Sequence, residues 1–290
     1  MFEGFETVDL EVTATTIHAR IGGSGPPVLL LHGYPQTHVI WHKIAPRLAE
    51  RFTVVATDLR GYGDSGRPAS DPSHAAYAKR SMAADQVEVM AMLGHRRFAV
   101  VGHDRGARVA HRLALEHPEA VERLALLDIV PTRTVFATVN QAVATGYYHW
   151  FFLIQLNGLP ETLIGHDPEY YLREKLKRWC GADKQAITDE AFAEYLRCFA
   201  DPAAIHATCE DYRAAASIDL AHDEADLARR IACPLLALWG EVGLVGRNYD
   251  VLAVWRDYAT DVHGHALPCG HYLAEECPEA TLAALLAFLC

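Results

Sequence analysis

The stretch VVGHDRGARVAHRLALEHP, residues 100–118, decides how this chain folds. It starts with β-branched residues typical of a strand end and continues with a pattern typical of a helix. Between them, Gly102 to Gly106 form a turn with Asp104 in the middle. Such a strand–turn–helix connection lifts its central side chain above the sheet edge, where the helix dipole favours an anion. The alternative is that Asp104 only caps an ordinary helix.

Outward from this turn, the chain alternates short apolar runs with helical patterns. Continuous apolar strands separated by helices indicate a parallel sheet that is covered on both faces. We predict strands at residues 27–31, 52–56, 98–101, 124–127, 234–239 and 262–267. We predict helices at residues 77–93, 107–116 and 279–289.

The middle of the chain has a different character. Residues 133–217 contain no apolar strand run and place Ala, Leu and aromatic side chains at helical spacings. The sequence therefore predicts an α/β fold with a mostly parallel central sheet and an inserted helical cap domain. The expected boundaries are 1–132 for the first part of the core, 133–218 for the cap, and 219–290 for the second part of the core.

The composition excludes several classes of partner. The 290 residues carry a formal net charge of −11 and no basic run, so we expect no nucleic-acid binding. No apolar stretch approaches the ~20 residues of a membrane span, and no signal-peptide pattern is visible at the start. The seven cysteines are scattered and form no C-x-x-C pair. This favours reduced thiols and a cytoplasmic location.

Loops that follow the other predicted strands carry further candidate site residues, in addition to Asp104. Tyr34 lies in HGYP, residues 32–35, and its backbone N–H could pair with that of Arg105 to hold an oxyanion. The segment DLRGYGDSG, residues 58–66, follows the next strand. Asp128 ends a later strand, and His271 stands on a loop after the last one. The chain order is therefore nucleophile, acid, histidine.

With these motifs the chain resembles the α/β-hydrolases along nearly its full length. An aspartate nucleophile is typical of their dehalogenase and epoxide-hydrolase branch. In detail the chain is similar to the fluoroacetate (haloacetate) dehalogenases. The matching segments are HDRGAR at 103–108, LDIVPT at 127–132 and YHWFF at 148–152. The first and third segments together are quite specific, whereas HGYP and DLRGYGDSG indicate only the fold.

The triad acid has two candidates. Many members of the superfamily carry it after the strand predicted at 234–239, in a W-G-x-x-D pattern, but here Gly243 occupies that place. Asp128 ends the preceding core strand, and the fluoroacetate dehalogenase pattern also has an acid there. We therefore assign Asp128, with Glu241 as the fallback. The alternative for Asp128 is a strand-end cap.

The resemblance implies a two-step hydrolysis that needs no cofactor or metal. A carboxylate is ionised at pH 7, so Asp104 can displace a leaving group from saturated carbon and form an ester. His271, oriented by Asp128, then activates water to attack that ester. The N–H groups of Tyr34 and Arg105 hold the resulting oxyanion. The expected reaction converts a haloacetate and water into glycolate, halide and a proton.

Two arginines follow the nucleophile closely. Guanidinium groups suit a carboxylate, which they can bind through two hydrogen bonds. Arg108 lies four residues after Asp104 on the same helix face, and its alternative role is a local ion pair with Asp104 or Asp128. The resemblance favours binding of the substrate carboxylate by both Arg105 and Arg108.

The resemblance also implies a halide site in the cap. Haloalkane dehalogenases and epoxide hydrolases commonly carry tryptophan after the nucleophile, where this chain has Arg105. The donors must then come from the cap, and His149, Trp150 and Tyr212 match the halide pocket of the fluoroacetate dehalogenases. The alternative is that these three residues only pack the aromatic core of the cap.

Two other functions remain open at this point. An epoxide hydrolase needs two cap tyrosine hydroxyls above the nucleophile, which Tyr147, Tyr148 and Tyr212 could supply, but it leaves no role for the arginines. A non-catalytic ligand receptor on the same fold is a different class. The expected partner is a small haloacid, and the family resemblance implies a homodimer.

Overall fold

The computed structural model describes residues 1–290 and is built around one eight-stranded sheet with the order β1-β2-β4-β3-β5-β6-β7-β8. The six strands from β3 to β8 run parallel, whereas β1 and β2 are antiparallel to their neighbours. The strands are β1 (Glu6–Val12), β2 (Thr15–Gly22), β3 (Pro27–Leu31), β4 (Thr53–Thr57), β5 (Phe98–His103), β6 (Val121–Leu127), β7 (Leu235–Gly240) and β8 (Val262–Leu267).

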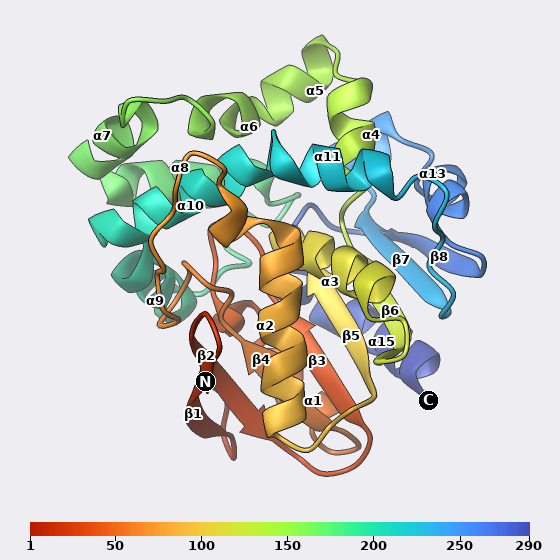
Figure 1. The fold of residues 1–290 in the computed structure, drawn as a ribbon. Helices are drawn as coiled ribbons and strands as arrows, with labels where there is room; N and C mark the ends of the chain where they lie inside the picture. Colours follow the sequence, from red (N-terminus) through yellow and green to blue (C-terminus); the bar gives the residue numbers. More distant parts are fainter.

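Helices cover both faces of this sheet. In Figure 1, α2 and α3 lie in front of the sheet, and α15 lies behind it. The helices outside the long β6–β7 connection are η1 (His38–Trp41), α1 (Ala45–Leu48), η2 (Ala75–Tyr77), α2 (Lys79–Met92), α3 (Arg105–Glu116), α12 (Leu244–Asn248), α13 (Val251–Tyr258), α14 (Leu273–Glu276) and α15 (Pro278–Leu289). None of the helices combines the length and the apolar character that a membrane span needs.

The connection between β6 and β7 contains helices only. They are α4 (Thr132–Ala137), α5 (Gln141–Gly146), α6 (Tyr148–Leu153), α7 (Leu159–His166), α8 (Pro168–Trp179), α9 (Asp189–Phe199), α10 (Pro202–Ala215) and α11 (Ile218–Ala225). Figure 1 shows them gathered at one end of the sheet. The predicted fold, a mostly parallel sheet with an inserted helical cap, is confirmed. The helical stretch continues to Ala225, and the residue at which the cap domain ends stays a prediction.

The six predicted strands are present as β3 to β8, but the hairpin of β1 and β2 was not predicted. β1 lies at the edge of the sheet, and its sequence ETVDLEV mixes charged with apolar residues. Most of its side chains are exposed or half-buried. A strand with this pattern lacks the continuous apolar run on which the prediction depended.

The sheet brings the candidate residues to one edge. Gly102 pairs with Leu31 of β3, and His103 pairs with Leu127 of β6. Because parallel strands in register end at the same edge, the segments that follow β3, β5 and β6 emerge side by side. These segments carry Tyr34, Asp104 and Asp128. The cap inserted after β6 can therefore cover all three.

Candidate active site

Asp104 occupies the sharp turn between β5 and α3. Its φ of +47° lies in the left-handed region, which a non-glycine residue adopts only when the surroundings enforce it. A Cβ atom on Gly106 would lie 2.3 Å from the carbonyl oxygen of His32, so the turn needs glycine there to pack against β3. Asp104 is only 3% exposed. The fold thus holds this carboxylate in a strained and buried position at the start of a helix.

Asp128 and His271 form a hydrogen-bonded pair beside Asp104. The Nδ1 atom of His271 lies 2.6 Å from Oδ2 of Asp128, and its Nε2 atom lies 3.9 Å from Oδ2 of Asp104. The other oxygen of Asp128 accepts a hydrogen bond of 2.9 Å from the Gly240 N–H. His271 Nε2 has no hydrogen-bond partner. The three predicted triad residues are therefore together, with the histidine placed between the two acids.

The position of Gly243 accounts for the unusual place of the acid. A Cβ atom built on Gly243 would lie 3.5 Å from Oδ1 of Asp128. An acidic side chain at position 243, where the W-G-x-x-D pattern has its aspartate, would therefore lie beside the Asp128 carboxylate. Asp128 reaches this place from the end of the neighbouring strand β6. The fallback candidate, Glu241, is exposed and makes no hydrogen bond or ion pair with His271.

The charges of these residues depend on one another. Burial lowers the pKa of His271, but the hydrogen bond and charge of Asp128 and the charge of Asp104 outweigh it, so the pKa is raised. Burial raises the pKa of Asp104, but the charges of His271 and the neighbouring cations outweigh it and lower the pKa. Burial and the nearby His271 lower the pKa of His103 to about 3. Asp104 is thus ionised at neutral pH.

One of the two predicted oxyanion donors contacts the Asp104 carboxylate. The backbone N–H of Tyr34 donates to Asp104 Oδ1 over 2.9 Å. No hydrogen bond joins the Arg105 N–H to this carboxylate, although Arg105 opens helix α3 directly after it. The other oxygen of Asp104, Oδ2, lies on the side of His271 and accepts no hydrogen bond.

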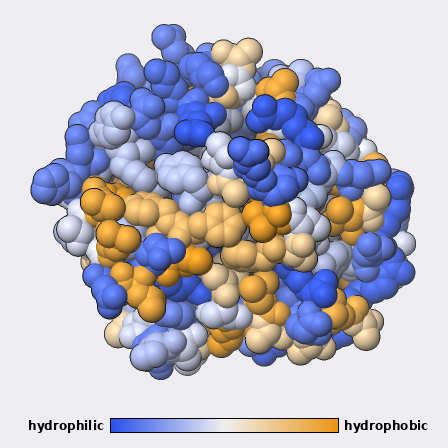
Figure 2. Space-filling model, turned by 90° about the horizontal axis from the view of Figure 1, so that it is seen from above, coloured by the Kyte–Doolittle hydropathy of each residue, from blue (hydrophilic) through white to orange (hydrophobic).

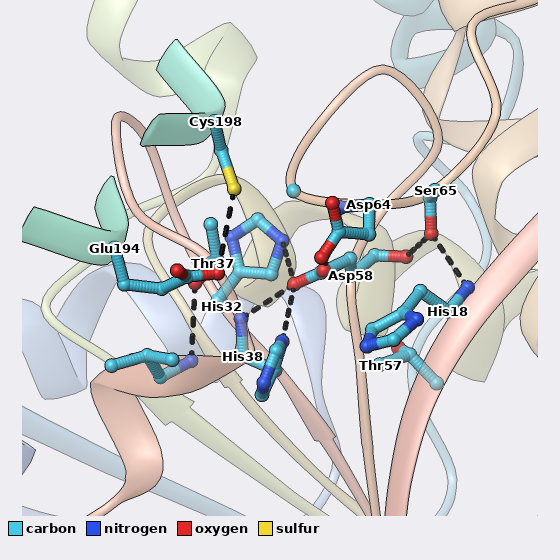
Figure 3. Close-up of polar contacts among 12 residues, drawn as sticks. His18, His32, Thr37, His38, Thr57, Asp58, Asp64, Ser65, Glu194 and Cys198 are labelled. Carbon is cyan, nitrogen blue, oxygen red and sulfur yellow. Dashed lines mark hydrogen bonds and ion pairs between the residues drawn. The ribbon is translucent and has the colours of Figure 1, made fainter. Parts of the chain in front are cut away.

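Buried polar contacts hold the loop that carries Tyr34 (Figure 3). Asp58 Oδ1 accepts a hydrogen bond of 2.7 Å from the His38 N–H and lies 2.9 Å from His38 Nδ1. His32 Nε2 accepts from the Leu59 N–H over 3.0 Å. The other ring nitrogen of His32 therefore donates to the Gly33 carbonyl, 2.9 Å away. These contacts connect the HGYP and DLRGYGDSG segments and fix the direction of the Tyr34 N–H.

Arg105 is held from behind by an acid that sequence reasoning missed. The Nε and Nη2 atoms of Arg105 donate to both oxygens of Asp211 over 2.9 and 2.6 Å. Asp211 also pairs with the buried Lys79 and accepts from the Tyr62 hydroxyl. The Nη1 atom of Arg105 is buried without a partner. Only the EDYR segment around Tyr212 could have drawn attention to Asp211.

Arg108 does not form the local ion pair that was its alternative role. Its Nη1 atom donates to the Val130 carbonyl and to the Thr132 hydroxyl, each over 3.0 Å. No salt bridge joins it to Asp104 or Asp128. Its Nε and Nη2 atoms are buried without partners. The carbon of its guanidinium lies 4.6 Å from the centre of the Trp150 ring, so the cap packs over the arginine.

The three predicted cap residues meet in one buried group. The rings of His149 and Tyr212 lie 5.4 Å apart, and those of Trp150 and Tyr212 lie 6.2 Å apart. His149 stacks on Tyr34 at 5.9 Å. Both ring nitrogens of His149, Nε1 of Trp150 and the hydroxyl of Tyr212 are buried without a hydrogen-bond partner. Buried polar groups are almost always paired, so these groups are available to a bound ligand or to water.

Two further cap residues complete the enclosure, and sequence reasoning missed both. The Trp179 ring lies 4.8 Å from His271 and 4.6 Å from His149. The Nζ atom of Lys175 is buried without a partner, 4.3 Å from the centres of the Tyr148 and Trp179 rings. Burial lowers the pKa of Lys175 well below its ordinary value. Both residues lie on α8, whose sequence shows only an ordinary amphipathic helix.

The site therefore combines one carboxylate with several unpartnered donors. Arg105 and Arg108 present free N–H groups from the core, and His149, Trp150 and Tyr212 present theirs from the cap. Burial, followed by the charges of Lys175 and Arg105, lowers the pKa of His149 well below 6.5, so its ring is neutral. Such an arrangement can bind a small anion beside Asp104 and stabilise a second anion that forms there.

Comparisons with known proteins extend over the full chain. The model of the α/β-hydrolase fold family matches residues 26–278. Fluoroacetate dehalogenase from Burkholderia sp. is 44% identical over 289 residues, which cover 100% of this chain and 95% of that protein. Soluble epoxide hydrolase from Corynebacterium sp. (strain C12) is 34% identical over 281 residues, covering 94% and 93%. A solved structure from Nostoc sp. PCC 7120, provisionally assigned as an α/β hydrolase, is 63% identical with a TM-score of 0.99, covering 100% and 99%.

The coupling between Asp104 and His271 gives a first prediction. Substituting Asp104→Asn removes a negative charge that raises the pKa of His271, so this pKa falls in the variant. Titration of the His271 ring by NMR measures the change. The exposed Asp71→Asn variant serves as the control and leaves the His271 pKa where it is. An unchanged pKa in Asp104→Asn would show that the two side chains are not coupled.

Proposed function

Because this chain belongs to the α/β-hydrolase family, we propose that it is a hydrolytic dehalogenase of haloacetates, with fluoroacetate as a substrate. The observation that carries the proposal is the set of buried donors without partners around Asp104. A haloacetate has an anionic carboxylate at one end and releases a halide from the other. The arginines of the core suit the carboxylate, and the donors of the cap suit the halide.

The first step forms an ester. Substrate lies with its carboxylate on Arg105 Nη1 and Arg108, which places its α-carbon against Asp104. Asp104 attacks through Oδ2 because Oδ1 accepts the hydrogen bond from the Tyr34 N–H. The attack comes from the side opposite the halogen, as a direct displacement at saturated carbon requires. The carbon–halogen bond breaks and the halide leaves with its electron pair. It accepts hydrogen bonds from His149, Trp150 and Tyr212.

The second step hydrolyses the ester. His271 Nε2 lies 3.9 Å from Asp104 Oδ2 and has no hydrogen-bond partner, which supports it as the base that activates water beside the ester. His271 takes a proton from this water, and the hydroxide attacks the Asp104 carboxyl carbon. The N–H groups of Tyr34 and Arg105 stabilise the oxyanion. Its collapse breaks the ester bond, and the leaving glycolate oxygen takes the proton from His271. The Asp104 carboxyl group then loses its own proton to solvent, which restores the carboxylate.

The charge coupling suits this order of steps. In the resting enzyme the negative charge of Asp104 raises the pKa of His271. Esterification removes that charge, so the histidine becomes less basic and loses its proton more readily. Asp128 remains hydrogen-bonded to Nδ1 and leaves Nε2 as the base. Formation of the ester therefore prepares His271 to activate water.

An epoxide hydrolase is the second candidate, and one observation favours it. Tyr212 presents a buried unpartnered hydroxyl, and the buried Tyr147 stacks on Trp150 at 5.2 Å. Two such tyrosines could protonate an epoxide oxygen. Arg105 and Arg108 would then have no ligand for their free N–H groups. A non-catalytic receptor is the third possibility, and steady halide release under excess haloacetate excludes it.

We also propose that the chain forms a homodimer through the cap. Figure 2 looks onto this side of the molecule and shows apolar side chains in a band across it. Leucines on and before α7 are exposed by about half or more, namely Leu156 (63%), Leu159 (48%) and Leu163 (58%). Exposed leucines gathered on one helix favour a protein–protein contact. Light scattering in solution gives the oligomeric state directly.

The second prediction isolates the two chemical steps. Ester formation needs no base, whereas hydrolysis needs His271, so the His271→Ala variant accumulates an ester on Asp104. Mass spectrometry of the intact protein measures it. Because the halide leaves, fluoroacetate, chloroacetate and bromoacetate give the same mass increase.

Two controls make this experiment decisive. The double variant with Asp104→Asn and His271→Ala gains no mass. Styrene oxide is tested in parallel, since an adduct from the epoxide without one from any haloacetate would identify an epoxide hydrolase. Binding of haloacetate without any adduct on Asp104 would contradict the covalent mechanism.

The third prediction concerns the halide donors. The Trp150→Phe substitution keeps the aromatic ring beside Arg108 and removes the indole N–H. Fluoride is the smallest and most strongly hydrated halide, so its departure depends most on donors that are already in place. A donor to a developing anion contributes roughly 2–4 kcal/mol, or about a hundredfold in rate. The variant therefore loses fluoroacetate turnover about a hundredfold more than bromoacetate turnover.

The measurement is the ratio of single-turnover rates for the two substrates. The half-buried Trp239, outside the group of cap donors, supplies a matched control, and Trp239→Phe leaves the ratio unchanged. An equal fall for both halides in Trp150→Phe would mean that this tryptophan only shapes the cap.

A further inference from the structure

A cleft of about 980 Å³ opens between the cap and the core next to the candidate site. Asp104 does not line this cleft, but three of the lining residues also contact the buried residues around Asp104. These lining residues are Tyr147, Trp179 and His271. Tyr147 stacks on Trp150, Trp179 packs against His149, and His271 faces Asp104. The cleft is thus the outer compartment of the same site.

The exposed charged side chains along this cleft are all cations. Arg178, Lys184 and Arg247 line it, and all three are exposed. The only carboxylate in the lining is Asp128, which is hydrogen-bonded to His271. Asp183 and Glu241 are neighbours in the sequence but do not line the cleft. The lining therefore presents three cations to solvent.

None of these cations is paired with an acid. Lys184 donates to the Cys180 carbonyl, and Arg247 Nε donates to the Gly243 carbonyl over 3.2 Å. Arg178 makes no ion pair, and the centre of the Tyr148 ring lies 5.7 Å from its guanidinium carbon. Most other arginines of the chain have a carboxylate partner, as Arg112 and Arg213 do. Unpaired cations gathered at the mouth of a cleft concentrate anions there.

The rest of the molecule repels anions. The chain has 37 acidic and 26 basic side chains and a net charge of −11. A net charge of this sign disfavours the approach of an anionic substrate. A local positive region whose inner wall is the catalytic histidine overcomes this repulsion. At physiological salt its reach is about 8 Å, so it acts at the mouth of the site.

From these observations we propose that the cleft is an anion-binding vestibule, in which Arg178, Lys184 and Arg247 capture small organic monocarboxylates before they reach Asp104. Its role in turnover rests on the proposed function, because a neutral substrate would gain nothing from it. The same cations attract the halide as it leaves past His271 and Trp179. They act on capture and release and do not touch the reacting carbon.

The kinetic test replaces Arg178, Lys184 and Arg247 together by glutamine. We expect the KM for fluoroacetate to rise about fivefold near 10 mM ionic strength, with kcat changed less than about twofold. The two proteins converge at about 0.5 M salt, where screening removes the difference. A control variant carries Arg51→Gln, Arg96→Gln and Lys177→Gln, which removes three exposed positive charges outside the cleft. Its KM stays within about twofold of the parent.

A second measurement does not depend on the reaction. Trp179 lines the cleft, and the difference in fluorescence between the protein and its Trp179→Phe variant reports on that side chain. Iodide quenches this signal as an anion, and acrylamide quenches it as a neutral molecule. In the triple glutamine variant the iodide quenching constant falls about threefold, and the acrylamide constant is unchanged.

These two readouts separate the possible failures. If the parent releases no halide but the iodide result holds, the vestibule stands and the proposed function is wrong. If haloacetates are turned over but the cleft variant behaves like the control in both KM and iodide quenching, the vestibule is wrong. Equal falls in iodide and acrylamide quenching would mean that the substitutions closed the cleft, which also overturns the proposal.

Discussion

The structure depends on keeping one buried carboxylate ionised. Asp104 is only 3% exposed, and a buried carboxylate without compensation takes up a proton. Here the charges of His271, Arg108 and Arg105 outweigh the burial and lower its pKa. The fold supplies these neighbours because His271 stands on the loop after β8 and both arginines lie on α3, directly after β5. The cap then excludes water without removing the compensating charges.

The same balance explains Asp211. Two arginines next to one carboxylate would leave an excess of positive charge in a buried space, which is unfavourable. Asp211 offsets part of it from behind and also pairs with the buried Lys79, so that Arg105 keeps only one free nitrogen toward the site. Arg108 is anchored by a carbonyl and a hydroxyl and keeps its full charge. The two arginines are therefore unequal, because Arg108 keeps two unpartnered nitrogens and Arg105 keeps one.

Sequence reasoning could predict the core of the site but not its outer contacts. Asp104 and Asp128 each follow an apolar strand, and His271 follows the last predicted strand, so the topology of a parallel sheet predicted that they meet at one edge. The family resemblance supported Asp128 over Glu241. The donors His149, Trp150 and Tyr212 were found only through a family resemblance, because cap helices show no pattern that separates a ligand contact from core packing. Asp211, Lys175 and Trp179 were missed for the same reason. The hairpin of β1 and β2 was missed because an edge strand with charged residues resembles a loop.

The proposed ester mechanism requires that the new oxygen of the product comes from Asp104 and not directly from water. A single turnover of fluoroacetate by excess enzyme in heavy-oxygen water tests it, with mass spectrometry of both product and protein. We expect unlabelled oxygen in the glycolate hydroxyl and one heavy oxygen in the Asp104 carboxylate. Labelled glycolate together with an unlabelled Asp104 would contradict it, because water would then attack the substrate carbon directly.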